Sequence, residues 1–160
     1  VYKRQACSCG AFYLAEYVPL ETLLKECDVI TLHTNATEEN HHLIDAKAIE
    51  TMKPGAVIIN TARGKLIDSA ALIAGLESGK LGGAALDVLE NENGLYYYNR
   101  MGDVIPNPEL DALRSMPNVI LTDHTAFYTE EDVESMVRGV LESADAFAKG
   151  QPTRHDVTNL

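Results

Sequence analysis

Short runs of apolar and β-branched residues alternate along the chain with segments that have helical spacing. Four of these runs are nearly continuous in their apolar character, as strands covered on both faces of a sheet tend to be. The pattern therefore predicts four buried strands, at residues 28–33, 56–60, 83–88 and 118–122.

Helix signals stand between these runs. A polar N-cap that begins a helix is offered by Asp68 and by Asn107, which is followed by a proline at the first helical position. The sequence Lys53-Pro54-Gly55 is a signal that ends a helix. Residues 129–132 resemble a capping box, and apolar residues continue behind them at helical spacing. We therefore predict helices over 20–26, 45–52, 68–76, from 108 onward, and a long amphipathic helix over 129–149.

The alternation of strands and helices predicts an α/β fold with a doubly wound, Rossmann-type parallel sheet, right-handed crossovers and helices on both faces. A dinucleotide-binding sheet of this type normally opens with a strand that runs into a G-x-G-x-x-G loop. That pattern does not occur in the sequence, and Gly82-Gly83 precedes a predicted strand instead. We therefore expect the domain to be truncated, so that the chain starts after the glycine-rich loop.

Charge and composition narrow the classes of function. The 160 residues include 13 basic and 24 acidic ones, and the net charge of −11 argues against nucleic acid as the main partner. No apolar run approaches the roughly 18 residues of a membrane span, so we predict no membrane partner. The three cysteines do not have zinc-finger spacing, which predicts no metal site and reduced cysteines in a cytoplasmic protein.

Residues suited to acid–base or anion-binding chemistry follow the predicted strands, at the sheet edge where ligands bind. Arg63 offers a planar fork of donors for a carboxylate, and His124 is a candidate general acid or base. Asp87 closes a strand, where a buried charge needs a partner or ligand, and Glu92 lies in a polar loop. Taken singly, each residue also fits an ordinary role, as a salt-bridged arginine, a hydrogen-bonded histidine or a solvated carboxylate.

Three segments together carry a resemblance to a known family. Residues 60–64 read Asn-Thr-Ala-Arg-Gly, residues 80–90 read Lys-Leu-Gly-Gly-Ala-Ala-Leu-Asp-Val-Leu-Glu, and residues 124–130 read His-Thr-Ala-Phe-Tyr-Thr-Glu. In this order and spacing the chain resembles the NAD-dependent D-isomer-specific 2-hydroxyacid dehydrogenases. Residues 95–98 and 128–131 look most like the D-lactate dehydrogenase branch. The resemblance implies hydride transfer between a nicotinamide cofactor and a small 2-oxo or D-2-hydroxy acid, with pyruvate and D-lactate as the expected pair.

The resemblance assigns roles to three residues. Arg63 would bind the substrate carboxylate and assist at its carbonyl, and His124 would donate the proton in reduction and accept it in oxidation. Glu92 would pair with His124, because a nearby carboxylate favours the imidazolium form and keeps a proton ready for the developing alkoxide. We therefore expect these three side chains to converge in one pocket.

Further positions match cofactor and substrate contacts of the family. Asp87 would accept a hydrogen bond from the nicotinamide carboxamide, and Phe127 would line the substrate pocket. The resemblance implies NAD as the cofactor. Ser8 stands where the family has a ribose-binding acid, and the loss of that charge removes repulsion against a 2′-phosphate, so NADP stays open as an alternative. The expected cofactor-binding residues are Thr34, Asn35, Asn40, Thr61, Ala62, Arg63 and Asp87.

The resemblance also predicts the domain organisation. The first five residues match one reading frame of a transposon end used in sequencing libraries, and we interpret residues 1–5 as a sequencing artefact. Residues 6–128 would form a partial NAD-binding domain, and residues 129–160 a long helix and tail that return toward a missing catalytic domain. The complete protein is expected to be a cytoplasmic homodimer, and this fragment alone to be inactive.

Some residues depart from the family pattern. Asp123 and Asn35 stand where proline is usual, and His41 and His42 match no catalytic role, so we interpret both histidines as surface residues. An alternative function from a different class is an NAD-sensing, co-repressor-like binding protein without turnover.

Overall fold

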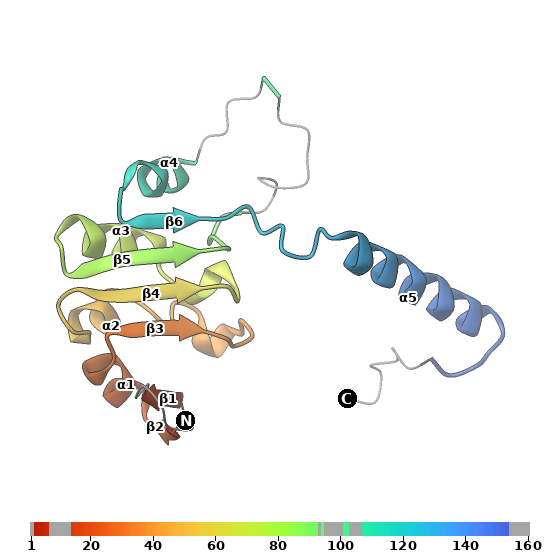
Figure 1. Cartoon of the computed structure of the whole chain (residues 1–160), viewed down its shortest axis with the longest axis horizontal. Helices are drawn as coiled ribbons and strands as arrows, with labels where there is room; N and C mark the ends of the chain where they lie inside the picture. The colour runs from red at the N-terminus through yellow and green to blue at the C-terminus, as the bar shows by residue number, and fades with distance from the viewer. Residues whose placement is uncertain (1, 7–13, 93, 95–100, 103–106, 154–160) are drawn as a thin grey trace. The chain divides into compact units, whose positions relative to one another are not determined.

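The computed structural model describes residues 2–6, 14–92, 94, 101–102 and 107–153. These residues form two compact units, the first ending at Asp123 and the second beginning at His124, and each unit is described by itself (Figure 1). Ser8, Cys7, Cys9 and the predicted aromatic segment 95–98 lie outside the described residues.

The first unit is built on a parallel sheet of four strands in the order β3-β4-β5-β6 (Figure 1). The strands are β3 (Val29–Leu32), β4 (Ala56–Asn60), β5 (Leu81–Leu86) and β6 (Val119–Leu121). All four predicted strands are confirmed, but β5 begins and ends two residues earlier than expected, so it includes Gly82 and leaves Asp87 just beyond its end. A Cβ on Gly82 would lie 2.4 Å from Gly55 O, so glycine allows a neighbouring loop to pack against this strand.

Helices α1 (Leu20–Glu26), α2 (Ala46–Thr51), α3 (Ser69–Glu77) and α4 (Pro108–Ser115) connect the strands of this unit at the expected places. The N-caps of the last three accept hydrogen bonds from backbone N–H groups three residues ahead. Asp45 binds Ala48 N at 2.8 Å, Asp68 binds Ala71 N at 3.0 Å, and Asn107 binds Leu110 N at 2.9 Å. Two single-turn 3₁₀ helices, η1 (Glu38–Asn40) and η2 (Gly64–Leu66), shape the loops after β3 and β4.

The helices bury one face of the sheet much more than the other. Ile30, Leu32 and Ile58 are buried, whereas Val29 and Ile120 are 55% and 67% exposed. Consecutive parallel strands in chain order, joined by crossovers of one hand, place their helices on the same face. The α/β Rossmann-type class is confirmed, and within the first unit Val29 of β3 and Ile120 of β6 lie on the less covered face of the sheet.

The core of this unit consists of aliphatic side chains from the sheet and from the helices on it. Ile44, Met52, Ile58, Leu66, Leu72, Leu81 and Leu113 are almost completely buried. Each contributes about 1.5–3 kcal/mol through burial of apolar surface. Leu66 and Ile44 lie in loops and are joined by a backbone hydrogen bond of 3.0 Å from Ile44 N to Leu66 O. The core therefore extends beyond the strands and holds the loops at the carboxyl edge of the sheet.

A separate antiparallel pair, β1 (Tyr2–Ala6) and β2 (Leu14–Val18), precedes the parallel sheet. Neither strand was among those predicted. β1 coincides largely with residues 1–5, and the interpretation of that segment as an artefact stays a prediction.

The second unit contains helix α5 (Glu130–Ala148), which confirms the predicted long helix. The Thr129 hydroxyl caps it by accepting a hydrogen bond from Asp132 N at 3.1 Å. No helix in the described part of the chain has the length and apolar character to cross a membrane. The apolar side chains Met136, Val137, Val140, Leu141 and Phe147 on this helix are exposed.

Candidate active site

Loops that carry the predicted site residues emerge from the carboxyl ends of β3, β4 and β5. Parallel strands end at one edge of a sheet, so their following loops meet there. Backbone bonds join these loops, with His42 N donating to Lys65 O at 2.9 Å and Asp87 N donating to Asn60 O at 2.9 Å. The first unit therefore holds three of the predicted loops together.

Asn60, the last residue of β4, shapes the loop that carries Arg63. Its side chain is 1% exposed and makes two hydrogen bonds to the loop backbone. Asn60 Nδ2 donates to Arg63 O at 2.9 Å, and Asn60 Oδ1 accepts from Ala62 N at 3.0 Å. Burial without these bonds would be costly, so the amide fixes the turn that follows the strand.

Gly64 brings this loop into direct backbone contact with the loop after β5. A Cβ at Gly64 would lie 2.0 Å from Leu89 O and 2.6 Å from Glu90 N. Only glycine allows so close an approach of two backbones. The contact sets the position of the segment Leu89–Glu92 relative to Arg63.

Arg63 is exposed at this edge. Its Nη1 donates to Ala62 O at 2.6 Å, which uses one of the five N–H donors of the guanidinium. Thr61 is also exposed and Ala62 is half-buried. The arginine is therefore accessible to an anionic ligand, which is consistent with its predicted role.

Glu92 is half-buried and folds back on its own loop. Its Oε2 accepts a hydrogen bond from Leu89 N at 2.8 Å. This bond closes a tight turn that places the carboxylate in the loop anchored by Gly64. Arg63 and Glu92 thus belong to two loops in backbone contact.

Asp87, the first residue after β5, has the partner that a half-buried charge needs. The Thr122 hydroxyl, just beyond β6, donates a short hydrogen bond to Asp87 Oδ1. The bond spans two adjacent strands and fixes the carboxylate at the sheet edge, where it can accept from a ligand amide.

The predicted cofactor residues after β3 form a loop held by its own amides. Asn40 Nδ2 donates to Asn35 O at 2.7 Å, and Asn40 Oδ1 accepts from Thr37 N at 2.7 Å. The Thr34 hydroxyl donates to the same Asn35 carbonyl at 3.4 Å. Asn40 therefore orders the loop, while Thr34 and Asn35 are exposed on it.

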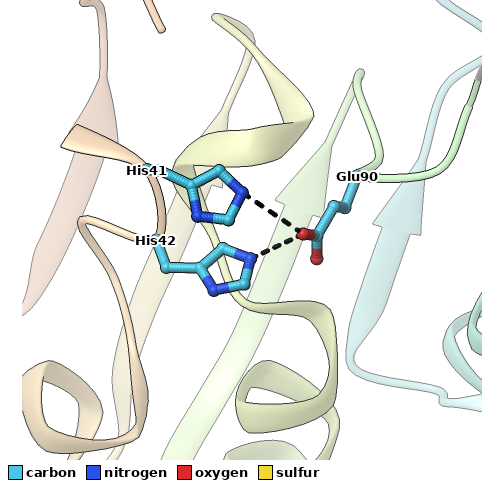
Figure 2. A group of neighbouring side chains, drawn as sticks. All are labelled: His41, His42 and Glu90. Atoms are coloured by element: carbon cyan, nitrogen blue, oxygen red, sulfur yellow. Dashed lines mark hydrogen bonds and ion pairs between the residues drawn. The ribbon is translucent and has the colours of Figure 1, made fainter. Parts of the chain in front are cut away.

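His41 is exposed, as expected of a surface residue, whereas His42 is half-buried, and both histidines face Glu90. His42 is half-buried and its Nε2 lies 2.5 Å from Glu90 Oε1, while His41 Nε2 lies 3.9 Å from the same oxygen (Figure 2). Neither histidine has Glu90 as a sequence neighbour, so only the contact between the loops after β3 and β5 reveals the group.

His124 and Phe127 belong to the second unit. His124 is half-buried and adopts a φ of 52°, an uncommon left-handed conformation for a residue other than glycine. Phe127 is half-buried and its ring contacts Tyr128 edge-on at 6.3 Å between centroids. The convergence of His124 with Arg63 and Glu92 therefore stays a prediction.

Asp123, which stands in place of the usual proline, belongs to the first unit and faces a cation. Its Oδ1 lies 3.8 Å from Arg114 Nη2, and both side chains are exposed. The arginine draws this carboxylate into a weak surface ion pair.

Sequence reasoning missed Asn60, Thr122 and Glu90 as residues that organise the site. A polar amide at the end of an otherwise apolar strand was the available signal for Asn60. Thr122 and Glu90 act across strands and loops, and a single sequence carries no comparable signal for them.

Comparison with known proteins agrees with this arrangement. The family model described as D-isomer specific 2-hydroxyacid dehydrogenase, NAD binding domain, matches residues 2–126. An aromatic 2-oxoacid reductase of Clostridium sporogenes (strain ATCC 15579) is 48% identical over 132 residues, which cover 82% of this chain and 40% of the relative. The D-lactate dehydrogenase of Escherichia coli (strain K12) is 43% identical over 136 residues, 85% of this chain and 41% of that protein.

Solved structures give the same result. The crystal structure of TP0037 from Treponema pallidum, a D-lactate dehydrogenase, matches with a TM-score of 0.81 and 40% identity over 89% of this chain and 43% of that one. The NAD-complexed D-isomer specific 2-hydroxyacid dehydrogenase from Lactobacillus delbrueckii ssp. bulgaricus matches with a TM-score of 0.80 and 37% identity, over 89% of this chain and 43% of that chain. The chain spans about two fifths of the length of these relatives. It belongs to the D-isomer specific 2-hydroxyacid dehydrogenase family, which it matches through the NAD-binding domain.

Proposed function

We propose that the protein to which this chain belongs reduces a small 2-oxo acid to the D-2-hydroxy acid with NADH, and catalyses the reverse oxidation with NAD. The observation that carries the proposal is the backbone contact between the loops of Arg63 and Glu92 at the carboxyl edge of the sheet. Asn60 shapes the first loop, and Gly64 lets it approach the second. Family membership supports the same reaction class.

Arg63 is the proposed carboxylate-binding residue. A guanidinium can hold a carboxylate through two parallel hydrogen bonds, which orients the neighbouring carbonyl as well as binding the anion. The hydrogen bonds from Asn60 to Ala62 N and Arg63 O fix the backbone that carries the Arg63 side chain. An oriented carbonyl is what hydride transfer requires.

His124 is the proposed proton donor, and Glu92 its carboxylate partner. When hydride adds to the carbonyl carbon, the carbonyl oxygen takes the imidazolium proton and becomes the hydroxyl group. In the oxidation the neutral imidazole takes that proton back. The Leu89 N–H group donates to Glu92 Oε2, which holds the carboxylate in its loop.

The residues at the sheet edge suit a nicotinamide. Asp87 offers a carboxylate oxygen that Thr122 holds in place, which fits a carboxamide N–H donor. Thr34, Asn35, Asn40, Thr61 and Ala62 are the further residues proposed to contact the cofactor. When bound, NADH supplies the hydride, while the chain supplies orientation and charge.

Pyruvate is the proposed substrate, with D-lactate as its product. The relative that is 48% identical is named an aromatic 2-oxoacid reductase, so phenylpyruvate is the main competitor in any assay. Phe127 is proposed to line the substrate pocket. We further propose that the complete protein is a cytoplasmic homodimer that uses NAD in preference to NADP.

The test is NADH oxidation by the complete protein with pyruvate, phenylpyruvate and a branched 2-oxo acid as substrates. We expect steady-state turnover, with the highest kcat/KM for pyruvate. Turnover of none of these acids would overturn the proposal, and NADH binding without turnover would favour the co-repressor-like alternative.

Arg63→Lys tests whether the guanidinium group itself is needed, because lysine keeps the positive charge but not the paired donors. Because lysine cannot replace the guanidinium fork, KM for the 2-oxo acid is expected to rise at least about tenfold, far more than KM for NADH. Arg138→Lys, at an exposed arginine of α5 paired with Glu134, is the matched control. Equal effects of Arg63→Lys on both Michaelis constants would contradict the assignment.

A further inference from the structure

His41, His42 and Glu90 gather three ligand atoms of the kind that borderline transition metals prefer. One ring nitrogen of each histidine and a Glu90 oxygen lie within 4.8 Å of one another (Figure 2). Two imidazoles and one carboxylate form a donor set suited to zinc, and a three-residue set leaves a fourth position for water or another ligand. The group comes from two loops that follow β3 and β5.

The backbone explains why adjacent histidines face the same partner. Successive side chains of an extended chain point to opposite sides, but His42 has a φ of 53°. A hydrogen bond of 2.9 Å from His42 N to Lys65 O holds this left-handed conformation in place. As a result the two rings lie face to face, with centroids 3.9 Å apart and planes tilted by 31°.

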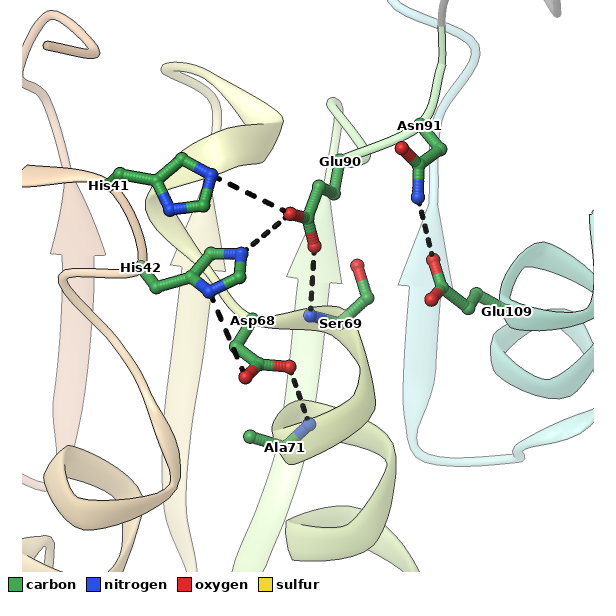
Figure 3. Close-up of polar contacts among 8 residues, drawn as sticks. All are labelled: His41, His42, Asp68, Ser69, Ala71, Glu90, Asn91 and Glu109. Atoms are coloured by element: carbon green, nitrogen blue, oxygen red, sulfur yellow. Dashed lines mark hydrogen bonds and ion pairs between the residues drawn. The ribbon is translucent and has the colours of Figure 1, made fainter. Parts of the chain in front are cut away.

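A second set of contacts orients the ligand groups (Figure 3). Asp68 Oδ2 lies 3.8 Å from His42 Nδ1, the nitrogen that faces away from Glu90. Ser69 N donates to Glu90 Oε2 at 3.4 Å, while Glu90 Oε1 faces both histidines. A carboxylate behind the remote nitrogen of a histidine is the usual support of a metal-binding imidazole, because it fixes the ring and raises its basicity.

Distances and charge both suit a divalent cation. Zinc bound tetrahedrally at roughly 2.0–2.2 Å from each ligand needs ligand atoms about 3.3–3.5 Å apart. The observed separations of 2.5 Å and 3.9 Å from Glu90 Oε1 bracket that range, so small side-chain rotations would admit the ion. Glu90 and Asp68 also place two carboxylates beside the imidazoles, and a divalent cation would balance their negative charge.

The geometry points to a zinc site formed by His41, His42 and Glu90, with Asp68 as the positioning carboxylate behind His42. The site is separate from the proposed catalytic residues and does not depend on the proposed function. It joins the loops after β3 and β5, so bound metal would stiffen the sheet edge that carries Glu92.

The test measures Zn²⁺ binding to the 160-residue chain by competition with a chromophoric chelator. All three cysteines are first replaced by serine, because thiolates also bind zinc. We expect one Zn²⁺ per chain. A further expectation is a Co²⁺ complex with the visible absorption of tetrahedral coordination.

Variants of the cysteine-free chain locate the site. Glu90→Gln and His41→Gln are expected to raise the Kd for Zn²⁺ at least tenfold and to abolish the Co²⁺ absorption. Asp68→Asn keeps the N-cap of α3, because asparagine caps helices as well as aspartate does. It removes the carboxylate beside His42 Nδ1, so we expect the Kd for Zn²⁺ to rise about tenfold.

His33→Gln is the matched control. This exposed histidine follows β3 and contacts the Thr31 hydroxyl, so its loss should leave the Kd within twofold. Absence of one-to-one binding in the cysteine-free chain, or the same Kd in Glu90→Gln as in the parent, overturns the proposal. So does a loss in His33→Gln as large as in His41→Gln. Circular dichroism of each variant confirms that the fold is retained.

Discussion

Replacement of Gly64 by alanine is expected to destabilise the fold through one backbone contact. The new Cβ would lie 2.0 Å from Leu89 O and 2.1 Å from the Leu89 carbonyl carbon. The two loops must separate by about 1 Å to reach 3.0 Å, below which Cβ contacts are essentially not found in proteins. The obstacle is backbone rather than a flexible side chain, so we expect the upper end of the cost of overpacking, about 3 kcal/mol.

Urea denaturation of the chain and its variant measures this cost as a change in the free energy of unfolding. A loss of about 3 kcal/mol corresponds to a fall in Tm of roughly 6–12 °C for a chain of this size. Gly75→Ala in α3 is the matched control, because its Cβ would meet only side-chain atoms of Ile49 and Leu81 at 3.0–3.3 Å. Alanine also favours a helix by about 1 kcal/mol over glycine, so this control should stay within about 1 kcal/mol of the parent. A Gly64→Ala variant as stable as the Gly75→Ala variant would refute the reasoning.

The remaining predictions concern three residues, Asn60, His124 and Glu92. Asn60→Ala leaves Ala62 N and Arg63 O without their buried partner, so we expect unfolding measurements to show a loss of about 2–4 kcal/mol. Asn118→Ala, which removes one exposed bond to Gly82 O, should cost under about 1 kcal/mol, and a similar cost for both would refute the prediction. In the complete protein, His124→Gln should lower kcat for reduction by about 10²–10⁴ with NADH affinity retained, as stopped-flow binding and turnover would show. Glu92→Gln should lower kcat less, and an unchanged kcat would contradict the pairing of Glu92 with His124.

The strands of the parallel sheet and the helices of the first unit could be predicted because their signals are local, whereas β1 and β2 were not predicted. Continuous apolar runs marked β3 to β6, and capping residues such as Asp45, Asp68 and Asn107 marked the starts of α2, α3 and α4. The error at β5 has a tertiary cause. Gly82 indicates a turn when read locally, but the neighbouring backbone at Gly55 requires glycine inside the strand. Which face of the sheet the helices pack on likewise depends on strand order, and no local sequence pattern encodes that order.

The candidate site was predictable only as far as residue identity matched a family motif. Arg63, Asp87 and Glu92 fall at the expected sheet edge, because parallel strands end together. The role of Glu90 could not be foreseen, since its partners His42 and Ser69 lie 48 and 21 residues away in sequence. Its contacts arise from the packing of three loops, and such packing is fixed by the core beneath them, at Ile44 and Leu66.

Two residues without reactive groups govern the geometry on which the proposed chemistry depends. A parallel sheet brings strand ends together, but only to within the spacing between strands, whereas catalysis needs side chains placed to about 0.5 Å. Asn60 reduces the freedom of the Arg63 loop through two buried bonds, and Gly64 removes the gap to the loop of Glu92. Both act on backbone, so they fix the points from which the Arg63 and Glu92 side chains extend. The precision of this edge therefore resides in an amide and a missing Cβ, which is why their replacement should disturb substrate binding as well as stability.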